Sequence, residues 1–375
     1  MKILIACDSF KDSLPALAVC QALDAGIKKA QPELQTQLFP MADGGEGTAM
    51  IMTYHAQGQW RVVEVEGPLN TPIQAGYGLS KDHQVAYIDM AEASGLQLVP
   101  PNLRNPLQTT SFGTGQLIQD AIHQGVDKIL LGIGGSATND GGMGMASALG
   151  YRFFDRHGNL LLGKGKELNA ISQIEPPSQQ FPTIEVLCDV NNPLYGARGA
   201  AAVYGPQKGA SKEIVDQLDQ GLQHLAKLVN RTLHKDLADV PGAGAAGGMG
   251  YGAMVFLKGA LKSGIEAVMD EAKFNEALAS ADIVITGEGK IDAQTLQGKL
   301  INGICQRAGR FGIPVIAVCG TLLASSDLIR EIGLQAAFSI QRYPSSLAAA
   351  LKEARPGLES IGFQLANTLF WQSNP

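Results

Sequence analysis

The chain has 375 residues, of which 45% are hydrophobic, and it carries a formal net charge of −6 with a pI near 5.6. Because typical domains hold about 100–200 residues, this length predicts two domains, and the hydrophobic share excludes a disordered or low-complexity chain. The acidic balance argues against a nucleic-acid-binding protein, which usually has a clustered basic face, although single loops of an acidic protein still bind anions.

Segments that direct export or membrane insertion are not predicted. The first apolar run, 3–7, ends too early for a signal peptide, and no run approaches the ~18 apolar residues of a membrane span. The five cysteines are widely spaced and form no C-x-x-C pair, so neither a disulfide framework nor a zinc site is indicated. We therefore expect a cytoplasmic protein with reduced thiols, without membrane or nucleic-acid partners.

The N-terminal region predicts alternating strands and helices. The short apolar run 2–7 is typical of a buried strand, and Ser13 is a candidate N-cap for a helix whose apolar residues recur at helical spacing to Ile27. A second strand is expected at 36–40, and a further helix after the glycine-rich segment 44–47. A strand–helix–strand start of this kind predicts a parallel sheet.

From about residue 60 the pattern indicates a different sheet. Segments 61–66 and 84–89 alternate between apolar and polar residues, and 67–70 is a turn, which is typical of an antiparallel or mixed sheet. Two buried strands and two helices complete this region, at 128–132, 185–188, 143–149 and 214–233. We therefore expect a second domain to begin near residue 65.

Strand–helix alternation returns at the C-terminal end. Three strands are expected there, at 282–286, 314–319 and 336–340. One helix is expected near 299–309 and another between the last two strands. Because this pattern matches the N-terminal one, we infer a discontinuous parallel-sheet domain made of 1–65 and 275–375, with a mixed-sheet α/β domain inserted at 66–274. The cleft between the two domains is then the expected binding site.

Two glycine-rich segments imitate nucleotide-binding motifs. Residues 242–247 match G-x-G-x-x-G, but no convincing strand precedes them, so a tight turn feeding a helix is a better interpretation than a nicotinamide site. Residues 158–165 nearly match a Walker A loop, but Gly165 stands where a Ser or Thr should hold magnesium, and a hairpin with a surface loop is expected. A kinase of the P-loop or protein-kinase type is therefore not predicted.

Acidic and basic residues follow the first two predicted strands. Ligands of open α/β sheets bind beyond the carboxyl ends of the strands, and there Lys11 is placed to neutralise a phosphate and Asp8 to face magnesium. Asp43 and Glu46, three residues apart among glycines, are hard oxygen ligands that suit magnesium. A solvated turn after the first strand and a helix-capping role for Glu46 are the structural alternatives.

A glycine-rich loop at 132–142 lies between a predicted strand and a predicted helix. Its backbone N–H groups predict an anion nest, to which Ser136 and Thr138 add hydroxyl donors. This arrangement suits a phosphate or a carboxylate, and a simple turn is the alternative.

A lysine between two carboxylates is the strongest chemical signal. Lys290 lies between Glu288 and Asp292 on a segment, 286–292, that is expected to be a strand-end loop. A further acid, an amide and two cations come from the inserted domain, at Asp189, Asn191, Arg198 and Lys208. Since none of the six histidines lies in a glycine-rich loop, this set favours phosphoryl transfer, in which positioning and electrostatics do most of the catalysis.

Taken in chain order, six segments resemble the bacterial glycerate kinase family over essentially the full length. The matching segments are 8–11, 40–47, 134–142, 199–209, 242–248 and 286–292. The resemblance implies a flavodoxin-like or Rossmann-like domain with an inserted α/β domain, and transfer of the γ-phosphoryl group of ATP to D-glycerate with Mg²⁺. The implied product is 2-phosphoglycerate, with 3-phosphoglycerate as the alternative. Asp12 departs from the family pattern, in which glycine usually follows the lysine, and this leaves the placement of Lys11 open.

Each candidate residue has an expected role within this resemblance. Asp189 is the expected general base, while Lys11 and Lys290 offset charge on the transferring phosphoryl group. The expected substrate or phosphate contacts are Ser9, Gly134, Gly135, Ser136, Thr138, Asn139, Asn191, Arg198 and Gly287. The expected magnesium ligands are Asp8, Asp43, Glu46, Glu288 and Asp292. A nicotinamide-dependent hydroxy-acid oxidoreductase and a non-catalytic small-acid-binding protein are the alternative functions, and a monomer or homodimer is expected.

Overall fold

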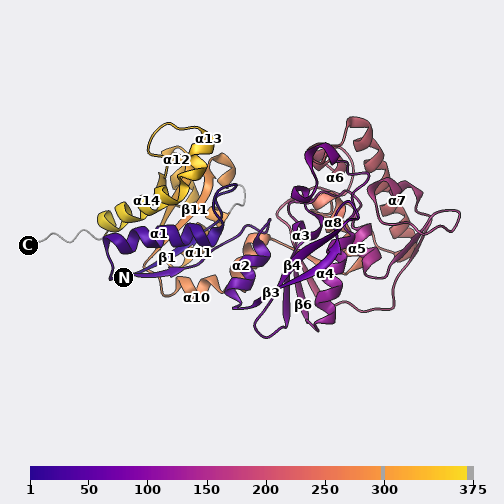
Figure 1. Cartoon of the computed structure of the whole chain (residues 1–375), viewed down its shortest axis with the longest axis horizontal. Coiled ribbons are helices and arrows are strands. Elements are labelled where there is room, and N and C mark those ends of the chain that lie inside the picture. Colours follow the sequence, from indigo (N-terminus) through magenta and orange to yellow (C-terminus); the bar gives the residue numbers. More distant parts are fainter. Residues whose placement is uncertain (297–299, 370–375) are drawn as a thin grey trace, which may run out of the picture. The chain divides into compact units, whose positions relative to one another are not determined.

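The structure, a computed structural model, describes residues 1–296 and 300–369 (Figure 1). The chain divides into two compact units: unit 1 comprises Met1–Asp43 and Ile265–Pro375, and unit 2 comprises Gly44–Gly264. Segments from both ends of the chain therefore belong to one unit. The domain boundaries expected from the sequence stay a prediction. None of the described helices is long and apolar enough to cross a membrane.

Unit 1 is built on a five-stranded parallel sheet with the strand order β13-β12-β11-β1-β2. Its strands are β1 (Lys2–Cys7), β2 (Gln35–Leu38), β11 (Ile283–Ile291), β12 (Val315–Leu322) and β13 (Ala336–Ser339). Its helices are α1 (Ala16–Ala30), α9 (Gly264–Glu271), α10 (Phe274–Leu278), η5 (Ala293–Leu296), α11 (Leu300–Arg310), α12 (Ser326–Ile332), α13 (Leu347–Lys352) and α14 (Ala354–Leu369). The central strands are continuous apolar runs because both faces of a parallel sheet are covered.

Two helices from opposite ends of the sequence pack closely in unit 1, where α1 and α14 lie side by side (Figure 1). A Cβ atom on Gly26 would lie 2.0 Å from the Glu359 carbonyl oxygen. One on Gly362 would lie 2.4 Å from the Leu23 carbonyl oxygen. Only glycine permits this approach of the two backbones, which closes the apolar core between the helices and the sheet.

Two local predictions for unit 1 are wrong. Ser13 does not cap α1, because its N–H belongs to the turn at Phe10 and its hydroxyl donates to the Leu351 carbonyl oxygen at 2.7 Å. The helix begins directly after Pro15, which is its N-cap residue. The segment 286–292 is not a strand-end loop, because β11 continues to Ile291 as a ladder with β12. The other predicted elements of this unit are confirmed within a few residues, and residue 299 of the predicted helix lies outside the described residues.

Unit 2 contains a six-stranded mixed sheet with the order β10-β9-β6-β5-β4-β3. The strands are β3 (Gln59–Glu66), β4 (Pro72–Leu79), β5 (Val85–Asp89), β6 (Lys128–Gly132), β9 (Thr183–Leu187) and β10 (Ala260–Lys262), and a separate pair is formed by β7 (Arg152–Phe154) and β8 (Gln173–Glu175). Strands β5, β6, β9 and β10 are parallel, whereas β3, β4 and β5 are antiparallel. The mixed α/β architecture predicted from the sequence is confirmed.

The helices of unit 2 vary from single turns to the long amphipathic helix expected near its middle. They are α2 (Thr48–His55), α3 (Ala91–Ser94), η1 (Leu96–Leu98), η2 (Pro101–Leu103), α4 (Phe112–His123), α5 (Met143–Ala148), η3 (Gly165–Ala170), α6 (Ala200–Tyr204), η4 (Pro206–Lys208), α7 (Lys212–Leu233) and α8 (Ala245–Phe256). In α7, buried leucines recur every three to four residues, which is the pattern that its sequence predicted.

The two segments of unit 2 that imitate nucleotide motifs have structural roles. Residues 242–247 form the turn that leads into α8. Gly247 adopts a φ of 72°, and a Cβ atom there would lie 2.0 Å from the Thr138 carbonyl oxygen, so the segment is a close-packing turn. The segment 158–165 begins in a tight turn, whose Asp155 carboxylate accepts from two backbone N–H groups. Both interpretations made from the sequence are confirmed.

Candidate active site

Three carboxylates gather near the carboxyl end of β1 in unit 1. Asp8 follows β1, and Glu288 lies on β11, the neighbouring strand. Asp43 follows a segment that runs beside β1, where the Met41 N–H donates to the Cys7 carbonyl oxygen at 2.8 Å. Burial, and then the negative charges of Asp43 and Glu288, raise the pKa of Asp8 to about 7. Asp43 and Glu288 are therefore close enough to Asp8 to repel its carboxylate.

Strand β11 orients the lysine that the sequence placed between two acids. Glu288 and Lys290 are two residues apart on the strand, so their side chains leave the same face of the sheet. The Thr295 hydroxyl donates to Glu288 Oε1 at 2.9 Å, and Lys290 Nζ lies 2.7 Å from Asp292 Oδ2. The Lys290 side chain is 55% exposed, so its ammonium group is accessible to an anionic ligand. Gly287, by contrast, is buried.

In the loop after β1, Asp12 adopts a backbone conformation that is usual for glycine. Asp12 has a φ of 61°, in the left-handed region that aspartate enters more readily than most residues. The departure from the family pattern at this position therefore preserves the turn. Ser9 donates its N–H to Asp8 Oδ1 at 2.6 Å, and the Lys11 side chain is exposed just beyond the strand.

The acidic side chains of unit 1 fit a magnesium ion that is also coordinated by water and by substrate phosphates. Among residues 1–296 and 300–369, no group of three or more His, Cys, Asp or Glu side chains is arranged to hold a metal ion by itself. Magnesium is usually held by one or two carboxylates together with waters and substrate phosphates. Asp8, Asp43 and Glu288 offer hard oxygen donors, and a cation would relieve the repulsion that raises the pKa of Asp8.

Asp189 is held at the carboxyl edge of the sheet in unit 2. It follows β9, and its Oδ1 accepts from the Ser263 hydroxyl at 2.9 Å and from the Gly264 N–H at 3.0 Å, just beyond β10. Because β9 and β10 are parallel, both strands deliver these groups to the same edge. The side chain is exposed, so an oriented carboxylate is accessible to the hydroxyl group of a ligand.

Asn191 and Arg198, the other predicted contacts that follow β9, are both exposed. Their loop is braced by Asn192, whose Nδ2 donates to the Arg198 carbonyl oxygen at 2.8 Å. The Tyr204 hydroxyl donates to Asn192 Oδ1 at 2.7 Å. The backbone of Arg198 is therefore fixed, while its guanidinium group faces solvent.

Lys208 binds the glycine-rich loop from inside unit 2. Its Nζ donates to Ser136 Oγ at 2.8 Å and to the Thr138 carbonyl oxygen at 2.6 Å, and only 2% of the residue is exposed. Burial lowers the pKa of Lys208 to about 7, although the negative charge of Asp140 opposes this shift. The sequence indicated a cation for a ligand here, but nothing in it signals that this lysine is buried.

Only the first part of the glycine-rich loop faces solvent. Gly135 is exposed and Gly134 is half-buried. The predicted contacts that are buried are Ser136, Thr138 and Asn139. Further along, the Ala137 N–H already donates to the Ser94 carbonyl oxygen at 2.8 Å. An anion arriving from solvent would therefore meet the backbone of Gly134 and Gly135 first.

Asp140 connects the same loop to the start of α4 through hydrogen bonds. It was not among the site residues predicted from the sequence. Its Oδ2 accepts from the Ser111 N–H and hydroxyl, both at 2.7 Å, and from the Gly144 N–H at 3.3 Å. Its Oδ1 accepts from the Gly142 N–H at 3.1 Å. Burial raises the pKa of Asp140, and these hydrogen bonds oppose the rise. The loop is thus closed by a buried carboxylate.

A second acidic group in unit 2 was also missed. Asp89 ends β5 and accepts from the Ala49 N–H at 3.1 Å, at the start of α2. Its pKa is raised to about 7, chiefly by burial, and the charges of Glu92 and Glu46 add to the rise. Glu46 thus acts on Asp89 in unit 2, whereas Asp43 acts on Asp8 in unit 1. The strand-end rule that singled out Asp8 could also have found Asp89.

Replacing Lys208 by methionine should flatten the pH dependence of stability. The folded-state pKa of Lys208 is about 7, whereas an unfolded lysine has a pKa of about 10.4. Between these values the unfolded chain binds more protons, so the stability of the wild type should rise with pH relative to the variant. We expect the free energy of unfolding of the wild type to rise, relative to that of Lys208→Met, by roughly 1 kcal/mol per pH unit between pH 8 and 10. Urea unfolding measures both free energies.

The matched control for this prediction is Lys227→Met, which changes an exposed lysine on α7. Its unfolding free energy should follow that of the wild type at pH 6, 8 and 10. Parallel pH profiles for the wild type and Lys208→Met would contradict a neutral, buried amine in the folded protein.

Comparison with known proteins places this geometry in context. Residues 3–370 match the glycerate kinase family. A Halalkalibacterium halodurans protein named glycerate kinase is 46% identical, with 99% of each chain covered. An Escherichia coli K12 protein named glycerate 2-kinase is 44% identical, with 98% of each chain covered. A Salmonella typhimurium LT2 crystal structure with the provisional name glycerate kinase 2 has a TM-score of 0.89, 46% identity and 98% of each chain covered.

Proposed function

Because the chain belongs to the glycerate kinase family, we propose that it transfers the γ-phosphoryl group of ATP to a hydroxyl group of D-glycerate. The observation that carries the proposal is the group of three carboxylates near the carboxyl end of β1, with Lys290 on the neighbouring strand β11. We propose 2-phosphoglycerate as the product, because a relative from Escherichia coli is named glycerate 2-kinase. Such a reaction relies on positioning and on charge stabilisation rather than on covalent chemistry.

The cationic and acidic side chains of unit 1 suit the triphosphate. Asp8, Asp43 and Glu288 would hold Mg²⁺, which when bound neutralises charge on the phosphate oxygens. Lys290 and Lys11, both exposed, would offset the charge of the phosphoryl group during transfer. These roles require no histidine, in keeping with the absence of histidine from the glycine-rich loops.

The exposed groups of unit 2 suit the acid substrate. Arg198 and the backbone of Gly134 and Gly135 would bind the carboxylate of glycerate. Asp189 would accept the proton of the attacked hydroxyl group, since Ser263 and Gly264 already orient its carboxylate. Proton transfer needs a base within hydrogen-bonding distance of the hydroxyl group, and the exposed carboxylate of Asp189 is accessible for such a contact.

A coupled assay of ADP release, with and without D-glycerate, tests this proposal. We expect ADP release that depends on ATP, on Mg²⁺ and on D-glycerate. Phosphorus NMR of the product then separates 2-phosphoglycerate from 3-phosphoglycerate. A glycerate-dependent change in NAD(P)H absorbance would instead indicate an oxidoreductase. Glycerate binding without ADP release would indicate a binding protein, and either result would refute the kinase.

A further inference from the structure

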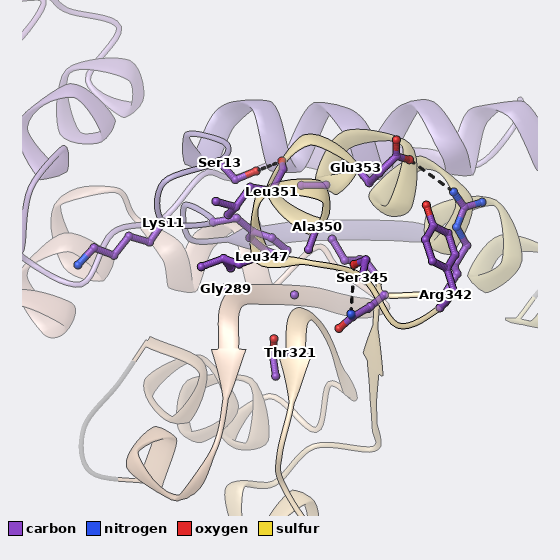
Figure 2. Close-up of a pocket in the computed structure, with 16 residues that line it drawn as sticks. Lys11, Ser13, Gly289, Thr321, Arg342, Ser345, Leu347, Ala350, Leu351 and Glu353 are labelled. Atoms are coloured by element: carbon purple, nitrogen blue, oxygen red, sulfur yellow. Dashed lines mark hydrogen bonds and ion pairs between the residues drawn. The ribbon is translucent and has the colours of Figure 1, made fainter.

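Unit 1 holds a hollow of about 710 Å³ at the carboxyl edge of its sheet (Figure 2). Its lining comes from the loop after β1, from β11 and β12, from the loop after β13 and from α13. The carboxyl edge of a parallel sheet is where small-molecule ligands bind. None of the roles assigned above to the acids and lysines accounts for it.

The walls of the hollow are largely apolar. Phe10 and Ile340 are buried beneath it, whereas Leu347 is 76% exposed and Tyr343 is 57% exposed on its lining. Large apolar side chains exposed around a concave surface indicate a ligand that covers them. Gly320 and Gly289 line the hollow without side chains, which leaves room for a flat group against the strand ends.

Charged groups lie at two ends of the hollow, with Lys11 at one end and Arg342 and Glu353 at the other (Figure 2). Gly289 faces the hollow beside Phe10 and Lys11, whereas its neighbours Glu288 and Lys290 on β11 are not part of the lining. In Figure 2 the Lys11 side chain extends away from the other lining residues, with its ammonium group outside the hollow. The site therefore has an apolar part and, next to it, a charged part.

We propose that this hollow binds the base and ribose of ATP, and that the triphosphate extends from it towards Lys11. The inference rests on the proposed kinase function and adds the location of the nucleoside. A nucleoside triphosphate is divided in the same way as the site, because it has a flat base at one end and anionic phosphates at the other. Hydrogen-bonding groups for the edge of a base are present at Thr321 and Gln341.

Glycerate is a poorer occupant of the hollow. It is a three-carbon anion with no flat apolar group to cover the exposed side chains of Leu347 and Tyr343. The negative charge of Glu353, 3.9 Å from the guanidinium group of the lining cation Arg342, also disfavours a small anion at that end (Figure 2). The hollow thus matches the apolar part of the nucleotide better than it matches the acid substrate.

The wall formed by α13 is held in place by the protein itself. Ser13 in the loop after β1 donates to the Leu351 carbonyl oxygen at 2.7 Å (Figure 2). At the other end of the helix, Ser346 is the N-cap and accepts from the Ala349 N–H at 3.3 Å. A wall that is fixed before the ligand arrives lowers the entropy cost of binding.

A matched pair of substitutions on α13 tests the proposal. Ala350 lines the hollow, whereas Ala348 is exposed on the same helix and is not part of the lining. Ala350→Trp should fill the space and weaken binding of the ATP analogue AMP-PNP, with Mg²⁺ present, at least tenfold by isothermal titration calorimetry. Ala348→Trp should bind it within about twofold of the wild type.

A second variant guards against misfolding of Ala350→Trp. Leu347→Asp changes a side chain that is 76% exposed, so the core is untouched and circular dichroism should match the wild type. It should weaken AMP-PNP binding at least fivefold and raise the KM for ATP, while the KM for D-glycerate stays unchanged. If both KM values rose instead, the substitution would act on the overall structure of the protein and not on nucleotide binding, and the proposal would be overturned.

The failures of the two proposals are distinguishable. Unchanged AMP-PNP affinity in both Ala350→Trp and Leu347→Asp, with normal glycerate phosphorylation by the wild type, would overturn the nucleoside site alone. Loss of AMP-PNP binding in these variants, with no phosphorylation of glycerate by the wild type, would support the nucleoside site and overturn the kinase. A wild type that fails to bind AMP-PNP with Mg²⁺ would overturn the site.

Discussion

Asp189→Asn should lower kcat for glycerate phosphorylation by about 10²–10⁴-fold, the range expected when a general base is removed. Asparagine keeps the shape of the side chain and can still accept from Ser263 and Gly264 through its amide oxygen. It cannot take a proton from a substrate hydroxyl group, so the KM for ATP should change little. Steady-state kinetics with purified protein measure both parameters.

The control for this substitution is Asp216→Asn, which removes the charge of another exposed acid of unit 2, on α7. Its kcat should equal that of the wild type. Ser263→Ala, which removes only one of the bonds that orient Asp189, should have a smaller effect, on the order of tenfold. A kcat for Asp189→Asn within about threefold of the wild type would rule out Asp189 as the base.

Asp140→Ala should reduce the free energy of unfolding by about 3 kcal/mol, because a buried network loses the acceptor that all its members share. The carboxylate accepts from the backbone of Ser111, Gly142 and Gly144. Alanine leaves these donors buried and without that acceptor, and each unsatisfied group costs about 1–3 kcal/mol. Relief of the buried charge offsets part of the loss.

Urea unfolding followed by tryptophan fluorescence and circular dichroism measures this effect. Ser111→Ala is the graded comparison, because it removes the hydroxyl that donates to Asp140 and accepts from the Met145 N–H at 2.9 Å. It should cost about 1–2 kcal/mol. If Asp140→Ala were no more destabilising than Ser111→Ala, the carboxylate would not be the centre of the network.

Strand positions were the most predictable part of the fold. The continuous apolar runs of β1 and β6 can be read directly, because buried parallel strands are apolar on both faces. The extension of β11 through Gly287 and Gly289 could not be read, because it depends on pairing with β12. Glycine is disfavoured in strands, and only tertiary contact overrides that preference here.

The candidate site was predictable where chemistry follows topology. Asp8, Asp43 and Glu288 were singled out because they were expected at strand ends, and the structure brings Asp43 and Glu288 within electrostatic range of Asp8. The internal role of Lys208 was not predictable, because a lysine in a glycine-rich segment is normally exposed. Burial depends on which distant loop, here that of Ser136, packs over the side chain.

The pairing of β1 with β11 has a consequence for synthesis on the ribosome. Ile3 lies opposite Ile283, and the intervening residues take on the order of 14–55 s to translate. During that interval the first strand has no neighbour on one side, whereas Gly44–Gly264 is one continuous segment that can collapse on its own. A ribosome that stalls before β11 would release a chain with an open, apolar strand edge, which is a template for aggregation. Completion of the C-terminal segment is therefore the step that removes this hazard.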